Sequence, residues 1–451
     1  MIYRRKGSLT IFLALAMLTF LTFSLALVEG TRNYYLRVEG EQAMELAEFS
    51  ILSEYQQELF DNYHLFFLDL DYEQGEESVG ILEQQAKKYL TKNAARLQTK
   101  ELTAERFCRA TDDGGSAFFH QAVEWMKLKS GYILLEELFG SMEGIKLEEI
   151  SLETMLNERE GKADAILGKY RTEEREISFS VPLPDISFPS VRALSEAVFG
   201  TTEDLSKKST DLSERISQRK LSEGAGRKDE FSVTDMQLFH GYLFENFHYY
   251  GAEQEHVWNE CLEYQLEYVI SGKESDLGNL EQIMWRIFLL RAGGNYLFYH
   301  QDGGKSAKAQ AEAAALVGFL GNAALIELVK EIILISQAIE EGIGETRRIF
   351  TGEKVPLYQN GFFCGIEIGY REYLYLFLNV MNQRDKIYRS MDLVELEVRN
   401  RSGYGNFQLD HCVDAFELQW RYQFSGLFTA VPLLQDGVYE NRIVRKIYYE
   451  D

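Results

Sequence analysis

Twenty consecutive residues without a charge, Leu9 to Val28, constrain the fold of this chain more than any other feature. An α-helix of this length is about 30 Å long, which matches the hydrocarbon core of a bilayer. The apolar region of a signal peptide is usually shorter, about 7–15 residues. The stretch therefore predicts a transmembrane helix at 9–28 that stays part of the protein.

The flanking charges predict how this helix is oriented. Arg4, Arg5 and Lys6 precede it, whereas the first charge that follows is Glu29. Basic residues remain on the cytoplasmic side of a membrane, so residues 1–8 are expected to form a short cytoplasmic N-terminus. We expect a single-pass protein of the cell membrane with an extracellular body, and the lipid bilayer as its first partner.

Helical spacing continues beyond the predicted span. No proline occurs before Pro182, so one helix from about residue 8 to residue 60 is expected. Small residues recur on one face of this helix at Ala43, Ala47 and Ser50. Because small side chains let another helix approach closely, these three residues form a candidate docking face.

The remaining chain has the composition of a folded, acidic body. The formal net charge is −24, and removing the three positive charges of residues 4–6 leaves −27 on residues 29–451. Such a body repels phosphate backbones, so no nucleic-acid partner is expected. Apolar residues make up 45% of the chain and the mean hydropathy is −0.25, which predicts a sizeable core and no further membrane span.

Composition divides this body into three parts. Residues 29–200 form the membrane-proximal part, and residues 231–451 form an aromatic-rich helical part with a C-terminal strand. Residues 201–230 between them are rich in charge and lack aromatic side chains. This composition predicts a flexible polar linker or loop.

The expected fold class is α+β, mostly helical, with a long N-terminal transmembrane helix that extends into an extracytoplasmic body carrying a small, mainly antiparallel sheet. Residues 78–110 have helical spacing, and residues 313–326 predict a buried helix. The clearest strand runs over residues 416–424, where apolar and polar side chains alternate. We expect it to pair with strands at 177–181 or 363–368.

Motifs for metal or phosphate binding are weak. Residues 303–306, Gly-Gly-Lys-Ser, lack the first glycine of a phosphate-binding loop and better fit the first turn of a helix. His240, His248 and His256 are spaced by eight residues, too far apart for a metal pair on one helix face. The four cysteines form no C-x-x-C pair. We therefore expect no metal and no cofactor.

Asp112 and Asp113 are the weak candidates for an acidic site. Two carboxylates could act as general acid and base or bind calcium. An Asp-Gly sequence before a helix is also typical of a turn and an N-cap. The turn is the favoured interpretation.

Charged residues in apolar surroundings predict buried ion pairs. Arg286 and Arg291 are expected to pair with carboxylates at positions 263, 267 or 281. Glu345, in contrast, lies in a charged stretch that suits ion pairs on a helix surface.

The first residues resemble those of type IV pilin-like and Tad-pilus pseudopilin proteins. A basic residue precedes Gly7, and Ser8 to Phe12 open the apolar helix. In that class a dedicated peptidase cuts after the glycine, so the resemblance implies processing between Gly7 and Ser8. The fifth residue after the glycine is usually Glu in those subunits and is Phe12 here.

A broader resemblance is carried by KGSLTIFLAL (6–15), NYHLFFLD (62–69), DDGGSAFFHQAVEWMK (112–127), LEYQLEYVISGKESDLGNL (262–280), LLRAGGNYLFY (289–299), GEKVPL (352–357), YREYLYLFLNV (370–380) and MDLVELEVR (391–399). These stretches resemble a domain-of-unknown-function family of single-span exported proteins of Gram-positive bacteria. The genes of that family tend to lie beside Tad-like pilus or secretion genes.

Together these features predict a membrane-anchored extracytoplasmic structural or interaction protein that is not an enzyme. The resemblance implies an accessory or pseudopilin-like component of a Tad-like surface pilus or secretion apparatus, with other membrane or pilus-assembly proteins as partners. The alternative is an extracellular hydrolase or a ligand-binding ectodomain with an acidic site near Asp112 and Asp113.

Overall fold

The chain forms two compact units, each built from separate stretches. Unit 1 comprises Met1–Trp125, Arg219–Ser232 and Val394–Asp451, and unit 2 comprises Met126–Gln218 and Val233–Leu393. The domain boundaries predicted from composition stay predictions. The computed structural model describes residues 6–71, 78–130, 152–173, 188–211, 215–226, 231–252, 260–357, 367–401, 403–427 and 437–449.

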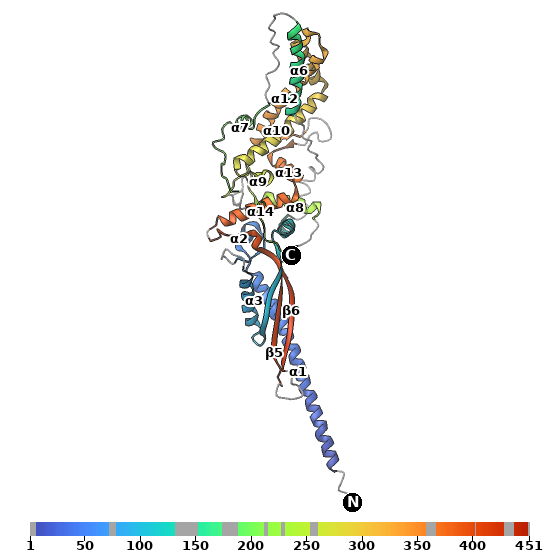
Figure 1. Cartoon of the computed structure of the whole chain (residues 1–451), viewed down its shortest axis with the longest axis vertical. Coiled ribbons are helices and arrows are strands. Elements are labelled where there is room, and N and C mark those ends of the chain that lie inside the picture. Colours follow the sequence, from blue (N-terminus) through green and yellow to red (C-terminus); the bar gives the residue numbers. More distant parts are fainter. Residues whose placement is uncertain are drawn as a thin grey trace. The chain divides into compact units, whose positions relative to one another are not determined.

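Unit 1 combines one long helix and several shorter ones with an antiparallel sheet (Figure 1). Its elements are α1 (Lys6–Leu52), α2 (Gln57–Tyr63), β1 (Leu68–Asp69), α3 (Val79–Asn93), β2 (Gln98–Arg109), η1 (Asp112–Gly114), the first part of α4 (Ser116–Ser130), the last part of α14 (Gln383–Arg399), η4 (Leu409–His411), β5 (Cys412–Ser425) and β6 (Val438–Tyr448).

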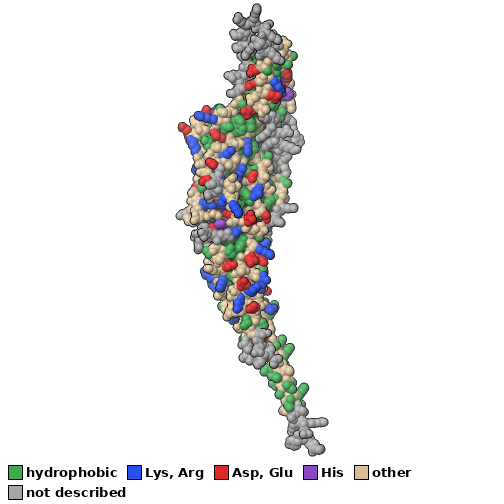
Figure 2. Space-filling model, viewed as in Figure 1, with side chains coloured by type: hydrophobic (Ala, Val, Ile, Leu, Met, Phe, Trp, Pro, Cys, Tyr) green, Lys and Arg blue, Asp and Glu red, His purple; other side chains and the backbone are tan. Residues whose placement is uncertain are grey.

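Helix α1 is continuous but has two different surroundings. Its first part is exposed, and Figure 2 shows apolar side chains along it; Phe20 exposes 72% of its surface. By length and composition this part can cross a membrane. Its second part is buried in the core of unit 1, where Leu36, Met44 and Ile51 are at most 1% exposed. The helix is therefore a candidate membrane anchor that continues into a folded core.

Helix α1 ends at Leu52, before the predicted end near residue 60. The backbone turns at Ser53 and Glu54. The side chain of Gln56 then caps α2 by accepting a hydrogen bond from the backbone N–H of Leu59 at 3.0 Å. Because α2 is itself helical, helical spacing continues across the turn, and the sequence pattern alone does not reveal the break.

Strand β5 is the centre of the sheet in unit 1. It pairs antiparallel with β1, β2 and β6. The even-numbered side chains of residues 416–424 are buried, whereas Arg421 on the other face is exposed. This alternation confirms the strand predicted there, and the whole arrangement confirms the mostly helical α+β class with a small antiparallel sheet.

The partners of this strand differ from the predicted ones. Residues 177–181 lie outside the described residues, and β4 (Glu367–Ile368) pairs with β3 (Val355–Pro356) instead. The main partner, β2, falls in the region that was predicted to be helical. The register of its pairing with β5 shifts at three places. At each shift the alternation of buried and exposed side chains that is typical of a strand is interrupted, so the sequence of β2 does not show it clearly.

Gly40 controls how closely α1 approaches the sheet. A Cβ atom at this position would lie 2.6 Å from the hydroxyl oxygen of Tyr422 on β5 and 3.3 Å from Cδ1 of Leu97. Only a residue without a side chain leaves this space to the tyrosine. Helix α3 contributes Leu82, Ala86 and Leu90 to the apolar core of unit 1 that also contains the buried part of α1.

Unit 2 is a helical bundle in which α10 and α12 pack on one another, and α12 also contacts α6, α7 and α11. Its elements are the last part of α4, α6 (Leu152–Glu173), α7 (Val191–Phe199), α8 (Val233–Asn246), α9 (Gln265–Ser271), α10 (Asp276–Gln301), α11 (Gly303–Val317), η3 (Gly318–Leu320), α12 (Ala323–Phe350), β3, β4, α13 (Tyr370–Val380) and the first part of α14.

The prediction of one buried helix at 313–326 is wrong. Helix α11 ends at Val317, and α12 begins at Ala323. Gly321 lies between them with a left-handed backbone, φ +64°, which a glycine adopts without a steric penalty. The uncharged stretch is thus the end of one helix, a turn and the start of the next.

A buried ion pair connects α10 with α12. Arg291 contacts both carboxylate oxygens of Glu345 at 2.8 Å, and the amide of Asn295 donates to the same carboxylate at 2.8 Å. Arg291 therefore pairs with Glu345 rather than with a carboxylate at 263, 267 or 281. Glu345, only 4% exposed, does not lie on the surface as predicted, because the arginine of the neighbouring helix compensates its charge.

The close packing of α10 on α12 can be tested by substituting two glycines of α12, one that faces α10 and one that does not. A Cβ atom at Gly342 would lie 2.9 Å from the Cβ of Ala292, whereas nothing lies within 4 Å of the Cβ position at Gly344. Gly342→Val should lower the free energy of unfolding by about 1–3 kcal/mol through overpacking. Gly344→Ala, the control, should leave it unchanged or raise it by up to about 1 kcal/mol through helix propensity. Urea denaturation of both variants measures the difference, and equal effects would contradict the close approach.

Candidate functional site

The candidate residues near the N-terminus all lie on α1. Gly7 and Ser8 fall in its first turn. Ala43 is 1% exposed and Ala47 is fully buried, both in the apolar core of unit 1. Ser50 is half-buried, and its hydroxyl donates to the carbonyl oxygen of Leu46 at 2.8 Å. The small-residue face therefore packs against the core of its own unit.

Asp112 acts as an acceptor for backbone N–H groups. Its carboxylate accepts from the amides of Arg109 at 2.8 Å, Gly224 at 2.8 Å and Gly226 at 3.2 Å. Three donors thus engage the two oxygens of one side chain. The favoured interpretation as a turn is confirmed, because η1 and the left-handed Gly115 directly precede α4.

The loop at residues 224–226 fits closely against this turn. A Cβ atom at Gly224 would lie 2.4 Å from the carbonyl oxygen of Phe107, and one at Gly226 would lie 2.1 Å from a carboxylate oxygen of Asp113. The backbone N–H of Ala225 also donates to the Phe107 carbonyl at 2.7 Å. Both aspartates therefore face this loop, and Asp112 holds it in place.

A second anchoring site in unit 1 contains Arg219, Glu395 and Asp410. Arg219 forms ion pairs with both carboxylates, and Asp410 also accepts from the backbone N–H of Ser222 at 3.0 Å. Burial alone would raise the pKa of Asp410, but the Ser222 amide and the guanidinium outweigh it and lower that pKa. For Glu395, burial outweighs the guanidinium and raises the pKa.

Unit 2 has an equivalent anchor at Asp276. This buried carboxylate accepts from the hydroxyl of Ser206 at 2.6 Å and from the backbone N–H groups of Glu263 at 2.8 Å and Tyr264 at 3.0 Å. The backbone of Asp276 also donates to the Lys208 carbonyl at 2.9 Å. Residues 206–208, near the start of the predicted polar linker 201–230, are thus attached to the N-terminus of α10.

Asp392 provides a further anchor in the same unit. Its carboxylate accepts from the backbone N–H of Ser217 at 3.0 Å, from the Ser217 hydroxyl at 2.6 Å and from the hydroxyl of Tyr268 at 2.7 Å. Burial raises the pKa of this carboxyl group despite these donors. Asp392 lies in a charged helical stretch that also contains Asp385, Glu395 and Glu397, so no local sequence signal distinguishes it.

Unit 2 also contains a buried pair of basic side chains. The ammonium of Lys386 lies 2.6 Å from Nε2 of His240, and the two residues are 2% and 0% exposed. Burial lowers the pKa of Lys386 to about 7. Burial, together with the nearby lysine, also lowers the pKa of His240. Which of the two nitrogens donates depends on the tautomer of His240 and on the protonation of Lys386.

Burial shifts the pKa of Glu267 in the opposite direction to the pKa of Lys386. Burial raises the pKa of Glu267 to about 7, although the hydroxyl of Tyr370 donates to it at 2.6 Å and the amide of Tyr250 at 2.8 Å. These groups are surrounded by aromatic rings, among them Phe350. The site is a polar contact inside an aromatic core.

The remaining motifs have structural roles. Residues 303–306 form the first turn of α11, as predicted, and Asp302 caps it by accepting from the backbone N–H of Lys305 at 2.7 Å. Nδ1 of His248 lies 2.7 Å from the carbonyl oxygen of Glu263, and His256 lies outside the described residues. Among the described residues, no group of three His, Cys, Asp or Glu side chains could hold a metal ion.

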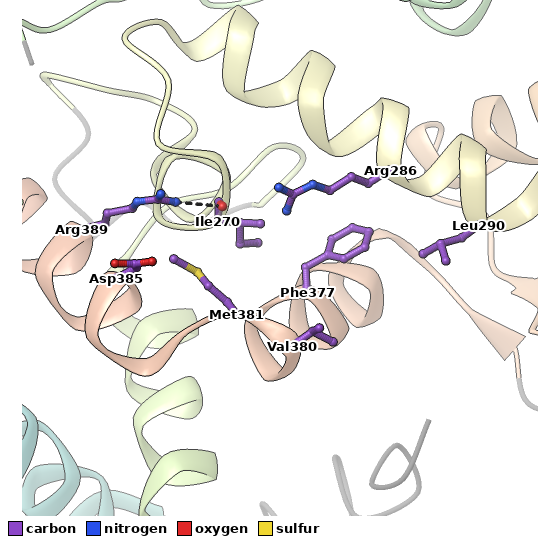
Figure 3. Close-up of a pocket in the computed structure, with 8 residues that line it drawn as sticks. All are labelled: Ile270, Arg286, Leu290, Phe377, Val380, Met381, Asp385 and Arg389. Carbon is purple, nitrogen blue, oxygen red and sulfur yellow. Dashed lines mark hydrogen bonds between the residues drawn. The ribbon is translucent and has the colours of Figure 1, made fainter. Parts of the chain in front are cut away.

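One pocket of about 540 Å³ in unit 2 combines charge with apolar surface (Figure 3). Arg286 of α10 and Arg389 of α14 point toward one another across it. Phe377, Leu290 and Ile270 supply apolar walls. No sequence motif predicted this pocket, because its residues come from four separate elements.

The buried lysine gives a prediction for the pH dependence of stability. The pKa of Lys386 is about 7 in the folded chain and about 10.5 in the unfolded chain. Its burial therefore costs nothing above pH 10.5, costs more as the pH falls to 7, and is constant below 7. Lys386→Met should raise the free energy of unfolding at pH 6 by about 1–4 kcal/mol, because an apolar side chain avoids this cost.

The gain should shrink steadily as the pH is raised from 7 toward 10.5, when urea denaturation is repeated along the series. Lys308→Met is the control, because that side chain is 76% exposed. It should change stability little and without this pH dependence. A gain from Lys386→Met that is equal at pH 6 and pH 10 would contradict the lowered pKa.

No curated protein and no solved structure matches the chain. Residues 172–361 and 364–424, more than half of the chain, match a family described as a family of unknown function (DUF5702). The protein belongs to that family.

Proposed function

We propose that this protein is a membrane-anchored structural or interaction protein of the cell surface, and an accessory or pseudopilin-like component of a Tad-like pilus or secretion apparatus. Helix α1 is the anchor, with its N-terminus in the cytoplasm and the body outside. Other membrane or pilus-assembly proteins are its partners, and the protein is not an enzyme.

The continuity of α1 is the observation that carries this proposal. One helix runs from Lys6 to Leu52 without interruption, so its lipid-compatible part and its buried part form one stiff element. A continuous helix transmits position and force from the membrane to the core of unit 1, whereas a flexible tether would not. Such a coupling suits a protein that works as part of an assembly.

The outer side of α1 supports an interaction role. Beyond the predicted span, Tyr35, Leu46 and Phe49 expose 56%, 52% and 65% of their surface. These exposed apolar side chains, which lie among exposed charged ones such as Glu41 and Glu45, offer a surface for protein contacts. The catalytic alternative has less support, because the backbone amides of Arg109, Gly224 and Gly226 already engage the carboxylate of Asp112.

The proposed topology predicts that the body is accessible from outside. Protease added to intact cells stripped of their wall should degrade the body, because the charges at residues 4–6 keep only the N-terminus inside. Immunoblotting with antibodies against the body measures the loss, and a cytoplasmic protein is the control. A fully protected body in intact cells, cleaved only after lysis, would contradict this orientation.

The proposed assembly role predicts a specific effect of the outer side of α1. Deletion of the gene in its native host should reduce Tad-like pili or secreted products, and wild-type protein should restore them. Phe49→Ser should fail to restore them, because it removes exposed apolar surface and leaves the core intact. Electron microscopy of surface pili and co-purification of pilus-assembly proteins in mild detergent measure both effects.

Ala47→Leu is the matched control on the buried side of the same turn. It should act by overpacking and lower the free energy of unfolding by about 1–3 kcal/mol, whereas Phe49→Ser should leave the free energy of unfolding close to the wild-type value. Pili that are unaffected by gene deletion would refute the assembly role. N-terminal sequencing of the same preparation distinguishes the two kinds of anchor: an end at Ser8 indicates pseudopilin processing, and an end at Met1 a plain anchor.

A further inference from the structure

The described lining of the pocket in unit 2 contains two arginines and one aspartate, whereas the protein as a whole is strongly acidic. Residues 29–451 carry a net −27, yet two guanidinium groups, Arg286 and Arg389, face the same pocket (Figure 3). Its volume of about 540 Å³ lies in the range of small-molecule sites, about 300–1,000 Å³. We propose that this pocket binds a small amphipathic monocarboxylate, with its carboxylate between the two arginines and its apolar part on the apolar walls.

Arg389 is positioned before any ligand arrives. Its Nη1 donates to the carbonyl oxygens of Val269 at 3.0 Å and Ile270 at 2.9 Å, at the end of α9. Gly272 makes room for it, since a Cβ atom there would lie 2.7 Å from the guanidinium carbon. In the described part of the chain no carboxylate forms an ion pair with Arg389. A guanidinium held in this way keeps donors for a carboxylate, and its fixed orientation reduces the entropy lost on binding.

The apolar side of the pocket defines the rest of the ligand. Phe377 is 94% buried, and its ring lies below Arg286 in Figure 3, with the guanidinium carbon 6.0 Å from the ring centroid. Ile270 and Leu290 extend this apolar surface. An inorganic anion would leave these walls in contact with water, whereas an aliphatic or aromatic group would cover them.

Asp385 limits the charge of the ligand. It lies one helical turn before Arg389 on α14 and also lines the pocket. A second negative charge on the ligand would be repelled there, while a hydroxyl group would find an acceptor. The site therefore fits a single carboxylate better than a phosphate ester or a dicarboxylate.

The test uses the full-length chain in phosphatidylcholine nanodiscs and isothermal titration calorimetry, with empty nanodiscs as the blank. The probes are 4-phenylbutyrate and decanoate, together with the uncharged 4-phenylbutanamide. Both carboxylates should bind, and the amide should bind at least about tenfold more weakly. Phenylphosphate should also bind more weakly than 4-phenylbutyrate, because of the carboxylate at Asp385.

Two substitutions change the charge of the pocket in different ways. Arg286→Gln removes one positive charge, and Leu290→Glu adds a negative charge to the wall. Each should weaken 4-phenylbutyrate binding by at least about tenfold. Arg192→Gln is the control, because that side chain on α7 is 90% exposed and does not line the pocket. It should bind like wild type, and thermal denaturation without ligand should confirm that all variants are folded.

Several results would overturn the proposal. These are no binding of either carboxylate up to about 10 mM, equal binding of acid and amide, or unchanged affinity in folded Arg286→Gln and Leu290→Glu chains. Because the readout is ligand affinity, it is independent of pilus assembly. Failure of this site and failure of the assembly role are therefore distinguishable.

Discussion

The burial of the second half of α1 against the β5 sheet is the contact on which unit 1 depends. Leu36, Met44 and Ile51 of the helix share one apolar cluster with Leu418 and Trp420 of the sheet. Apolar surface leaves water on this side of the helix, while the first half of the same helix keeps its apolar surface exposed and is a candidate membrane anchor. One continuous helix thus has an exposed apolar half and a half that is buried in the core of unit 1.

Four carboxylates, three of them buried and that of Asp112 half-buried, hold the described residues of the polar segment 201–230 that follows α7. In unit 2, Asp276 and Asp392 accept hydrogen bonds from Ser206 and Ser217. In unit 1, Asp410 and Asp112 accept from the backbone around Ser222 and Gly224. Hydrogen bonds from this segment offset part of the hydration that these carboxylates lose, so a segment with few apolar residues still has a defined path.

The two proposed interaction surfaces differ in charge. The outer side of α1 exposes the apolar side chains of Leu46 and Phe49 beside charged ones such as Glu45, and we propose that it contacts other proteins. The pocket of unit 2 combines Arg286 and Arg389 with apolar walls and is suited to a small ligand. Basic and acidic side chains are interspersed on the face drawn in Figure 2.

The sequence by itself determined the elements whose signals are local. An uncharged stretch of helix length predicted the anchor, alternation predicted the strand at 416–424, and the Asp-Gly turn at Asp112 followed from its neighbours. Tertiary structure alone decided the contacts between distant residues. The pairing of β2 with β5, the Arg291–Glu345 pair and the pocket at Arg389 join segments far apart in the chain. Their energies depend on which surfaces meet in space, and periodicity within one segment carries no information about its partner.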